Sequence, residues 1–264
     1  MRKLARLRKI LKELDSAVLA FSGGLDSSFL LKVANDTLGN KLLAVTANSA
    51  TYPKSELDFS RKLAKSLGAR HRVINTCELS DKKFSLNPSN RCYFCKKELF
   101  LQLKKIARKE KLKFVIDAQN ISDKGDFRPG TKAKNELGIR SPLEEAGFNK
   151  KDIRQLSKKM KLPSWDKPAA ACLASRIPYG RKISVPVLKR IEKAEEFLRK
   201  LGAKQVRLRH YDNFCRIETL PHDFALLIKQ RAKIVKQLKG LGYNYITLDL
   251  QGYRTGSLNE MIKK

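Results

Sequence analysis

Hydrophobic and polar positions follow two alternating periods along the first half of the chain. Short apolar runs predict buried β-strands at 16–21, 42–48, 71–76 and 113–120. Between them, apolar residues recur at helical spacing, most clearly over 55–68, where Gly68 ends the pattern. Strands that alternate with helices predict an α/β fold with a doubly wound parallel sheet. Ligands of such sheets bind beyond the carboxyl ends of the strands.

The last part of the chain has a different order of elements. A helix is predicted over 187–202, then two strands in QVRLRHY and FCRIET, a long helix over 222–242 and a final strand in YITLDL. This αββαβ order predicts a smaller α+β domain. The preceding segment 162–184 is rich in Pro, Ala and Ser and predicts a long loop, which favours a functional role. We therefore expect domains at 1–184 and 185–264.

The length and hydropathy of the chain set its broad class. Its 264 residues are enough to bury a substantial core in one large domain or two smaller ones. The N-terminus is basic, but its apolar residues have the spacing of an amphipathic helix rather than a signal peptide. No apolar run approaches the roughly 20 residues that span a bilayer. We expect a soluble cytoplasmic protein without a membrane partner.

The charge of the chain is strongly positive. Lys and Arg number 57 against 26 Asp and Glu, a formal net charge of +31. Such a charge attracts polyanions, from nucleic acid to phosphorylated metabolites, although a lysine-rich surface of a thermally adapted protein gives the same count. The basic residues run along the whole chain, and no RNA motif with interleaved aromatic residues is present. Phosphorylated small molecules are favoured, with nucleic acid as the lesser alternative.

The stretch SGGLDSS lies directly between a predicted strand and a predicted helix. Its glycines let the backbone turn tightly and approach a phosphate, and the amides of the helix N-terminus then face the anion. Asp26 would repel bare phosphate but suits a bridging Mg²⁺. The stretch is not a Walker A loop, and a simple capped turn is the alternative. The candidate nucleotide-binding residues here are Ser22, Gly23, Gly24, Asp26, Ser27 and Ser28.

A second polar stretch, DAQNISDKGDFRPG, follows the fourth predicted strand. It contains Asp117, Asn120, Asp123, Asp126 and Arg128. Carboxylates at the carboxyl end of a strand would help to position Mg²⁺, and Arg128 would pair with phosphate. An acidic surface turn with capping roles is the alternative.

The five cysteines, Cys77, Cys92, Cys95, Cys172 and Cys215, argue against a disulfide framework, because their number is odd. The spacing of Cys92 and Cys95 in NRCYFCKK suits a metal, a disulfide, a redox pair or two unconnected structural thiols. A zinc site usually has four Cys or His ligands, so Cys77 or Cys215 would have to join the pair. We predict instead that these two cysteines are core residues of apolar strands.

Basic residues of the smaller domain form a candidate phosphate site. Arg207 and Arg209 are two positions apart on a predicted strand and share one face. With Arg254 they would bind a phosphate through paired guanidinium contacts, and Glu218 would orient one of them. In the loop that precedes this domain, Ser175 and Arg176 follow Cys172 closely and would hold phosphate or an adenylate. A solvated basic face is the alternative.

The stretch SGGLDSS resembles the PP-loop signature of N-type ATP pyrophosphatases, which have an adenine nucleotide alpha hydrolase-like fold. The resemblance implies that ATP is cleaved between its α- and β-phosphates, that the loop binds pyrophosphate and that the acceptor becomes an adenylate. In that superfamily the end of the second strand contacts adenosine. The matching positions are Ala44, Thr46 and Asn48.

Together with GDFRPG, WDKPAAACLASRIPYG and the tail YITLDLQGYRTG, the loop resembles the LarE family of ATP-dependent sulfur transferases, which help to build the nickel-pincer cofactor. The resemblance implies a small phosphorylated substrate, pyridinium-3,5-dicarboxylic acid mononucleotide. Its carboxylate becomes an acyl-adenylate and then a thiocarboxylate. The matching arginines bind phosphate in that family, whose members form higher oligomers, so a homo-oligomer is expected.

Cys172 matches the sulfur-donating cysteine of that family. In one branch this residue gives up its own sulfur and becomes dehydroalanine, whereas in another it joins a CxxC pair to hold a 4Fe–4S cluster. The three cysteines Cys92, Cys95 and Cys172 resemble the second branch. Because such a cluster normally takes four thiolates, three leave one iron for an exogenous sulfide from a separate donor. The resemblance thus implies ATP, Mg²⁺ and a 4Fe–4S cluster.

The catalytic residues expected from this resemblance are Cys172, Asp26 and Arg176. Three alternatives remain open at this point: a cluster-dependent tRNA thiolase or other PP-loop sulfur transferase, sacrificial donation from Cys172, and a non-catalytic nucleotide- or RNA-binding scaffold. The intact SGGLDSS argues against the scaffold.

Overall fold

The computed structural model describes residues 2–123, 129–168 and 171–262, which group into two compact units. The first unit comprises Met1–Phe84 and Asn90–Ala170, and the second comprises Ser85–Ser89 and Ala171–Lys264. The chain therefore enters the second unit twice. The segment 171–184 groups with the second unit, while the functional division at Val185 stays a prediction.

The first unit is built on a four-stranded sheet of order β3-β2-β1-β4, in which every pair of neighbours is parallel. The strands are β1 (Ala17–Ala20), β2 (Leu42–Asn48), β3 (His71–Asn75) and β4 (Phe114–Ile116). This arrangement confirms the predicted doubly wound parallel sheet. The fourth strand is shorter than predicted because the backbone N–H of Asp117 donates to the carbonyl of Arg140 instead of a neighbouring strand.

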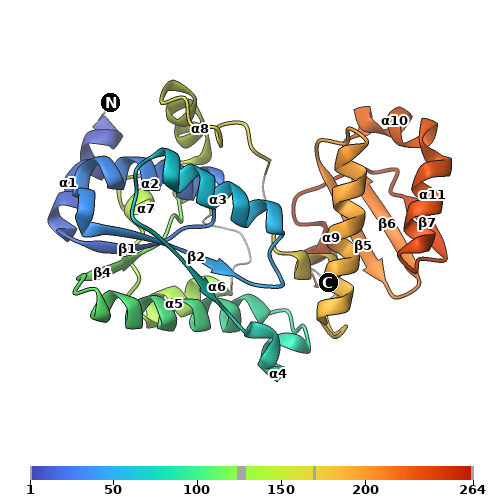
Figure 1. Ribbon diagram of the computed structural model, residues 1–264, viewed down its shortest axis with the longest axis horizontal. Helices are drawn as coiled ribbons and strands as arrows, with labels where there is room; N and C mark the ends of the chain where they lie inside the picture. The colour runs from blue at the N-terminus through green and yellow to red at the C-terminus, as the bar shows by residue number, and fades with distance from the viewer. Residues whose placement is uncertain (1, 124–128, 169–170, 263–264) are drawn as a thin grey trace. The chain divides into compact units, whose positions relative to one another are not determined.

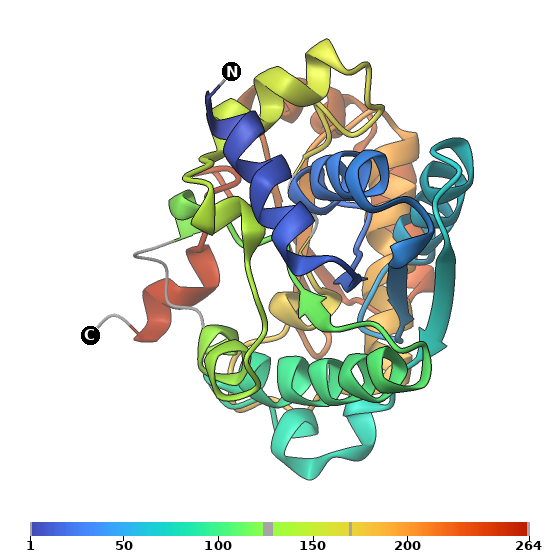
Figure 2. The ribbon, with the colours of Figure 1, turned by 90° about the vertical axis from the view of Figure 1, so that its left-hand side faces the viewer.

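Helices cover both faces of this sheet, with α1, α2 and α3 on one side and α5 on the other (Figures 1 and 2). The helices of this part of the chain are α1 (Arg2–Leu14), α2 (Leu25–Leu38), α3 (Lys54–Ser66), α4 (Lys82–Ser85), α5 (Arg91–Lys109), α6 (Gly130–Glu136), α7 (Pro142–Glu145) and α8 (Lys150–Lys159). Three of these helices, α4, α6 and α7, were not predicted from the sequence, because they are too short to show a helical period.

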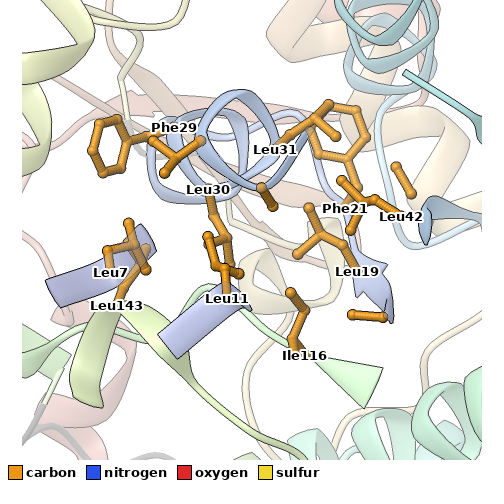
Figure 3. Packing of buried hydrophobic residues seen from close by; sticks show 14 of the residues in the cluster. Leu7, Leu11, Leu19, Phe21, Phe29, Leu30, Leu31, Leu42, Ile116 and Leu143 are labelled. Carbon is orange, nitrogen blue, oxygen red and sulfur yellow. The ribbon is translucent and has the colours of Figure 1, made fainter. Parts of the chain in front are cut away.

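The strands alternate their side chains between two hydrophobic clusters, as strand geometry requires. Leu19 of β1 and Leu42 of β2 join the cluster beneath α1 and α2, where side chains of β4 and α7 also meet them (Figure 3). Val18 and Leu43, their neighbours in sequence, face α5 on the other side. Burial on both faces explains why these strands are continuous apolar runs rather than alternating ones. The sheet is therefore a fixed base for the loops at its carboxyl edge.

The second unit has a three-stranded sheet of order β5-β6-β7, antiparallel between β5 and β6 and parallel between β6 and β7. Its elements are α9 (Val185–Lys200), β5 (Val206–Tyr211), β6 (Phe214–Thr219), α10 (Phe224–Lys229), α11 (Arg231–Gly240) and β7 (Tyr245–Leu248). The αββαβ order agrees with the prediction, but the single long helix is two helices that meet at Gln230. Neither Pro nor Gly marks that break in the sequence.

Short 3-10 helices occupy several connections: η1 (Gly39–Lys41), η2 (Glu78–Ser80), η3 (Ile121–Asp123), η4 (Leu173–Arg176), η5 (Pro221–Asp223) and η6 (Ser257–Ile262). Among the described residues, no helix combines the length and apolar character needed to cross a membrane.

Candidate functional site

The SGGLDSS loop joins β1 to α2 at the carboxyl edge of the first sheet, where a ligand is expected. Gly23 has a φ of +71°, in the left-handed region that glycine adopts at little cost. A Cβ at this position would lie 2.9 Å from Ser60 Oγ and 3.3 Å from the ring of Phe59. Position 23 therefore requires glycine, both because of its backbone conformation and because neighbouring side chains leave no room for a Cβ. Gly24 caps α2, so the first amides of the helix are available to an anion.

Hydroxyl groups fix the shape of this loop. Ser27 Oγ accepts from the backbone N–H of Ser22 at 3.3 Å and lies 3.1 Å from Ser22 Oγ. Ser27 Oγ also lies within hydrogen-bond distance, 3.2 Å, of the Gly24 carbonyl. Ser28 is fully buried, and within the described part of the chain its hydroxyl has no hydrogen-bond partner. Asp26 lies in the first turn of α2, which places a carboxylate beside the loop.

Lys167, which was not among the residues predicted from the sequence, contacts this loop. Its Nζ lies 2.8 Å from Glu56 Oε2 on α3, and it donates to the Gly23 carbonyl at 3.3 Å. The ammonium also lies 3.6 Å from the centre of the Phe59 ring, a cation–π contact. A cation is thus held against the backbone that would approach phosphate. The position of Lys167 in the WDKPAAAC motif was the sequence signal that could have identified this residue.

The end of β2 holds the three residues proposed to contact adenosine, and it lies at the same carboxyl edge as the SGGLDSS loop. Ala44 is buried in the sheet, whereas Asn48 is exposed and donates to Asn75 Oδ1 at 2.8 Å. The Thr46 hydroxyl lies 2.8 Å from His71 Nε2. Burial, with repulsion by Arg61, lowers the pKa of His71, which favours a neutral ring beside Thr46. The strand end nearest the loop is therefore polar but uncharged.

The polar stretch after β4 folds into a hydrogen-bonded turn at this edge. Asp117 accepts from Ser141 Oγ at 2.6 Å, and Asp123 accepts from the Asn120 backbone N–H at 3.3 Å. Lys150 Nζ lies 3.5 Å from Asp123 Oδ1. The predicted residues Asp126 and Arg128 lie outside the described residues. Asp117 and Asp123 thus have structural roles in this turn beside any role toward Mg²⁺.

The paired cysteines lie in the first turns of α5, and no disulfide links any of the five cysteines, all of which the structure describes. Cys92 is exposed and Cys95 is partly buried, so both thiols are accessible. Their spacing of three positions places them on one face of the helix. Figure 1 shows this end of α5 on the same side of the first unit as the tip of β2. The pair therefore lies toward the carboxyl edge of the sheet.

The remaining cysteines differ sharply in environment. Cys172 precedes η4 in the second unit and is partly buried. Cys215 is fully buried in β6, and burial raises the pKa of its thiol to about 12, which makes it a poor ligand. The prediction that Cys77 is a core residue was wrong: β3 ends at Asn75, and Cys77 is exposed in the following connection. In the described part of the chain, no three His, Cys, Asp or Glu side chains gather as a metal site.

Arg176 forms a buried ion pair that the sequence did not reveal. Its side chain is 1% exposed, and two guanidinium nitrogens donate to the two oxygens of Glu195 at 2.7 and 2.9 Å. A third nitrogen donates to the carbonyls of Ala171 and Cys172 at 2.7 and 3.0 Å. Burial alone would raise the pKa of Glu195, but its attraction to Arg176, Arg207 and Arg199 outweighs burial and lowers it. Arg176 therefore fixes the backbone around Cys172.

The pattern of α9 in the sequence could have identified Glu195 as a buried carboxylate. Leu188, Ile191 and Leu198 form the buried stripe of α9, and Glu195 occupies the position between the last two. A carboxylate in such a stripe requires a buried partner, which is Arg176.

The predicted phosphate arginines have different surroundings. Arg209 is buried and makes a two-nitrogen contact with Glu218 at 2.9 and 2.7 Å, so Glu218 orients it as predicted. Arg207 lies beside it on β5 and stacks 5.4 Å from the centre of the Tyr253 ring. Burial and repulsion by Arg176 lower the pKa of Arg207 to about 10. Arg254 instead pairs with Glu260 at the surface.

The lowered pKa of Arg207 has a direct chemical meaning. A cation that is desolvated and repelled by a neighbouring cation is stabilised when an anion binds beside it. The β5 face that carries Arg207 and Arg209 is therefore suited to a phosphate group.

Comparison with known proteins finds similarity over both units. Residues 12–81 match the family described as asparagine synthase. The chain is 42% identical to an uncharacterized protein of Synechocystis sp., over 99% of this chain and 98% of that protein. It is 37% identical to the pyridinium-3,5-bisthiocarboxylic acid mononucleotide synthase of Lactiplantibacillus plantarum, over 99% of this chain and 95% of that protein. An uncharacterized protein of Methanocaldococcus jannaschii is 32% identical over 97% of this chain and 98% of its own length.

Proposed function

Because the chain belongs to the LarE family of PP-loop ATP-dependent sulfur transferases, we propose that it converts pyridinium-3,5-dicarboxylic acid mononucleotide into a thiocarboxylate for the nickel-pincer cofactor. The chain is an ATP-using sulfurtransferase, and its substrate is the proposal. The observation that supports this substrate is the 37% identity, over nearly the whole chain, to a synthase named for the bisthiocarboxylic form of this nucleotide.

The first step activates a carboxylate. A carboxylate oxygen attacks the α-phosphorus of ATP, pyrophosphate leaves, and an acyl-adenylate forms. The SGGLDSS loop supports this step through the amides at the start of α2 and through the conformation that Gly23 gives the backbone. Asp26 and Asp123 are the carboxylates proposed to hold Mg²⁺, which would neutralise negative charge on the phosphates when bound.

Lys167 supports the same step. Its ammonium is held by Glu56 and the Gly23 carbonyl, within reach of any phosphate on the loop. When the triphosphate binds, Lys167 exchanges the Glu56 carboxylate for phosphate oxygens and neutralises charge on the leaving pyrophosphate.

The β5 arginines hold the phosphate of the mononucleotide. A bound anion stabilises the charge of Arg207 most, because burial and repulsion by Arg176 disfavour that charge. Glu218 orients the guanidinium of Arg209. Arg254 would complete the set by leaving Glu260, a surface pair that is worth little.

In the second step, a sulfur nucleophile adds to the carbonyl carbon, the bond from that carbon to the AMP oxygen breaks, and AMP leaves with the electron pair of that bond. Cys92, Cys95 and Cys172 are the residues proposed to hold a 4Fe–4S cluster, because they match the cysteines of the three-cysteine branch of the family and each is at least partly exposed. When bound, the cluster would supply the sulfur as sulfide on the iron without a protein ligand. Arg176 keeps the backbone of Cys172 in place.

The test is an anaerobic incubation of the iron-loaded protein with MgATP, sulfide and the dicarboxylic mononucleotide. We expect AMP and pyrophosphate in equal amounts, and a product heavier by the exchange of one oxygen for sulfur. Mass spectrometry should show Cys172 intact. A Cys172 that has lost the mass of H₂S would show sacrificial donation instead.

The Cys92→Ser variant is the matched control for the sulfur source. It should keep pyrophosphate formation while losing iron and thiocarboxylate. If pyrophosphate forms only with tRNA as the acceptor, the chain is a tRNA thiolase and the substrate proposal is wrong.

A further inference from the structure

The second unit contains a cavity of about 260 Å³ beside the end of β5. Its lining comes from the segment between η4 and α9, from the first turn of α9, and from the end of β5 with the turn that follows. Pockets that hold drug-sized ligands usually measure roughly 300–1,000 Å³, so this cavity suits a smaller molecule. Its apolar wall consists of Ile177, Pro178 and Val187.

This cavity does not belong to the β5 phosphate site. Successive side chains of a strand point to opposite faces, so His210 lies on the other face of β5 from its neighbour Arg209. Arg209 pairs with Glu218, whereas His210 contacts Tyr243. His210 lines the cavity and Arg209 does not. The phosphate proposed above therefore leaves this cavity without an assigned function.

The position of the proton on the His210 ring follows from its contact with Tyr243. His210 Nδ1 lies 3.1 Å from the Tyr243 hydroxyl, and the phenol is fully buried. Burial raises the pKa of Tyr243, so the hydroxyl keeps a hydrogen that needs an acceptor. Among the described residues, the hydroxyl has no hydrogen-bond partner other than Nδ1. Nδ1 therefore accepts, and the neutral ring carries its own hydrogen on Nε2.

The second nitrogen of this ring faces the cavity. His210 is 5% exposed and lines the cavity, whereas Tyr243, which lies against Nδ1, is fully buried and does not line it. Nε2 is at the side of the ring away from the phenol. In the part of the chain that the structure describes, no group is hydrogen-bonded to Nε2. The cavity thus contains a nearly buried donor that has no acceptor.

The charges around the cavity favour an anion. Lys182 is exposed on the lining, and it has no ion-pair partner within the ranges that the structure describes. Asp212, the carboxylate on the lining, already pairs with Arg181 at 3.2 Å. Burial, with repulsion by Arg190 of α9, lowers the pKa of His210 against the opposite effect of Asp212. A bound anion would compensate the positive charges near this ring.

We propose that this cavity binds a small organic carboxylate. Its oxygens accept hydrogen bonds from His210 Nε2 and Lys182 Nζ, and its hydrocarbon part packs against the apolar wall. A carboxylate has acceptor sites for both donors, whereas an inorganic anion would leave the apolar wall without a contact. The site is independent of the proposed sulfur transfer, because it uses neither the SGGLDSS loop nor the β5 arginines.

The test is a titration of the full chain, labelled with ¹⁵N-histidine, with benzoate in the absence of ATP and substrate. The chain has three histidines, so His71 and His222 serve as internal controls in the NMR spectrum. We expect His210 to carry its hydrogen on Nε2, and benzoate to shift the Nε2 resonance saturably while the two controls stay unchanged. Benzamide, a neutral molecule of the same shape, should bind at least about 10-fold more weakly.

Two results of this titration would overturn the proposal. One is a free protein in which His210 carries its hydrogen on Nδ1. The other is a set of His210 resonances that neither benzoate nor isovalerate, a smaller carboxylate, can move.

Inorganic phosphate tests the role of the apolar wall. Because phosphate has no hydrocarbon part, it should bind at least about 10-fold more weakly than benzoate. Phosphate that binds as tightly as benzoate would show a general anion site, and the assignment to an organic carboxylate would be wrong.

Two conservative variants test the donors. Lys182→Met should weaken benzoate binding about 5- to 10-fold, because one charge-assisted contact is lost. The matched control is Lys193→Met, at an exposed position of α9 outside the cavity lining, and it should bind benzoate as wild type does. Equal affinities in these two variants would contradict the role of Lys182.

Tyr243→Phe removes the hydroxyl that keeps the hydrogen on Nε2. The NMR spectrum should then show His210 partly protonated at Nδ1, and benzoate should bind about 5-fold more weakly. A merely structural role of the phenol would move neither the tautomer nor the affinity. A folded Tyr243→Phe protein with the wild-type tautomer and affinity would therefore refute this account of His210.

Discussion

The SGGLDSS loop and the β5 arginines are both suited to phosphate, but they are built in opposite ways. The loop offers backbone amides, hydroxyls and a glycine in a left-handed conformation, all within seven consecutive residues. In the β5 site, the charge of Arg209 is paired with buried Glu218 of β6. The charge of Arg207 is disfavoured by burial and by repulsion from Arg176, which itself pairs with Glu195 of α9. The loop depends on conformation, and the arginine site depends on long-range charge pairing.

This difference determines what each site costs the protein. The loop costs little stability, because glycine adopts the conformation of Gly23 readily, but it is sensitive to any added atom at that position. Buried ion pairs become strongly destabilising when one partner is removed, because the other charge is left without compensation. Changes in the arginine site should therefore act on stability, and changes in the loop should act on nucleotide binding.

The largest expected effect is that of Glu195→Gln. This residue is fully buried and accepts from Arg176, Arg199 and the Leu208 backbone N–H. Leaving Arg176 without a carboxylate should lower the free energy of unfolding by about 3–5 kcal/mol, measured by urea denaturation. The matched control is Glu196→Gln, whose exposed pair with Lys200 should cost no more than about 0.5 kcal/mol. Equal losses of unfolding free energy in the two variants would show that the buried contacts of Glu195 stabilise the fold no more than the exposed pair of Glu196.

The same variant has a defined pH dependence. The folded pKa of Glu195 lies below its ordinary 4.5, so the unfolded chain binds the proton more readily. The stability that this carboxylate contributes is complete above the ordinary pKa and is lost as pH falls through the folded value. The gap between wild type and Glu195→Gln should thus be widest near neutral pH and shrink below pH 4.5. A gap that widens in acid would contradict this assignment.

An intermediate effect is expected for Gly23→Ala. The added Cβ meets Ser60 Oγ at 2.9 Å and occupies a left-handed φ, so the loop should shift from its phosphate-binding conformation. ATP affinity, measured by calorimetry, should fall about 10-fold or more. Gly39→Ala also places a Cβ at a positive φ, but with open space around it, so it should cost stability while leaving ATP affinity intact.

The smallest effect is expected for Lys167→Met, which keeps the contact with Phe59 but removes the charge. Pyrophosphate and ATP should bind about 5- to 10-fold more weakly, because one charge-assisted phosphate contact is lost. Lys65→Met, on the exposed side of α3, is the control. If Lys167→Met and Lys65→Met bind pyrophosphate equally well, Lys167 pairs with Glu56 but does not contribute to phosphate binding.

The sequence predicted what is local and missed what is distant. Four strands, the SGGLDSS loop and the shared face of Arg207 and Arg209 follow from spacing and motif, and the structure confirms the sheet. The Lys167–Glu56 pair joins residues 111 positions apart, which no period in the sequence reveals. Cys77 was placed in the core because the third strand was predicted to run to residue 76, next to Cys77, whereas β3 ends at Asn75. Pairings of this kind are set by packing, which only the fold shows.

The double entry of the chain into the second unit also limits how this protein can be divided. A fragment of 171–264 would lack Ser85–Ser89, and so would expose the carbonyls of Ile177 and Pro178 that Asn87 covers. The second unit is therefore not an interchangeable module that recombination could move to another protein intact. During synthesis, Ser85–Ser89 must wait for their partners until residues near 183 have left the ribosome.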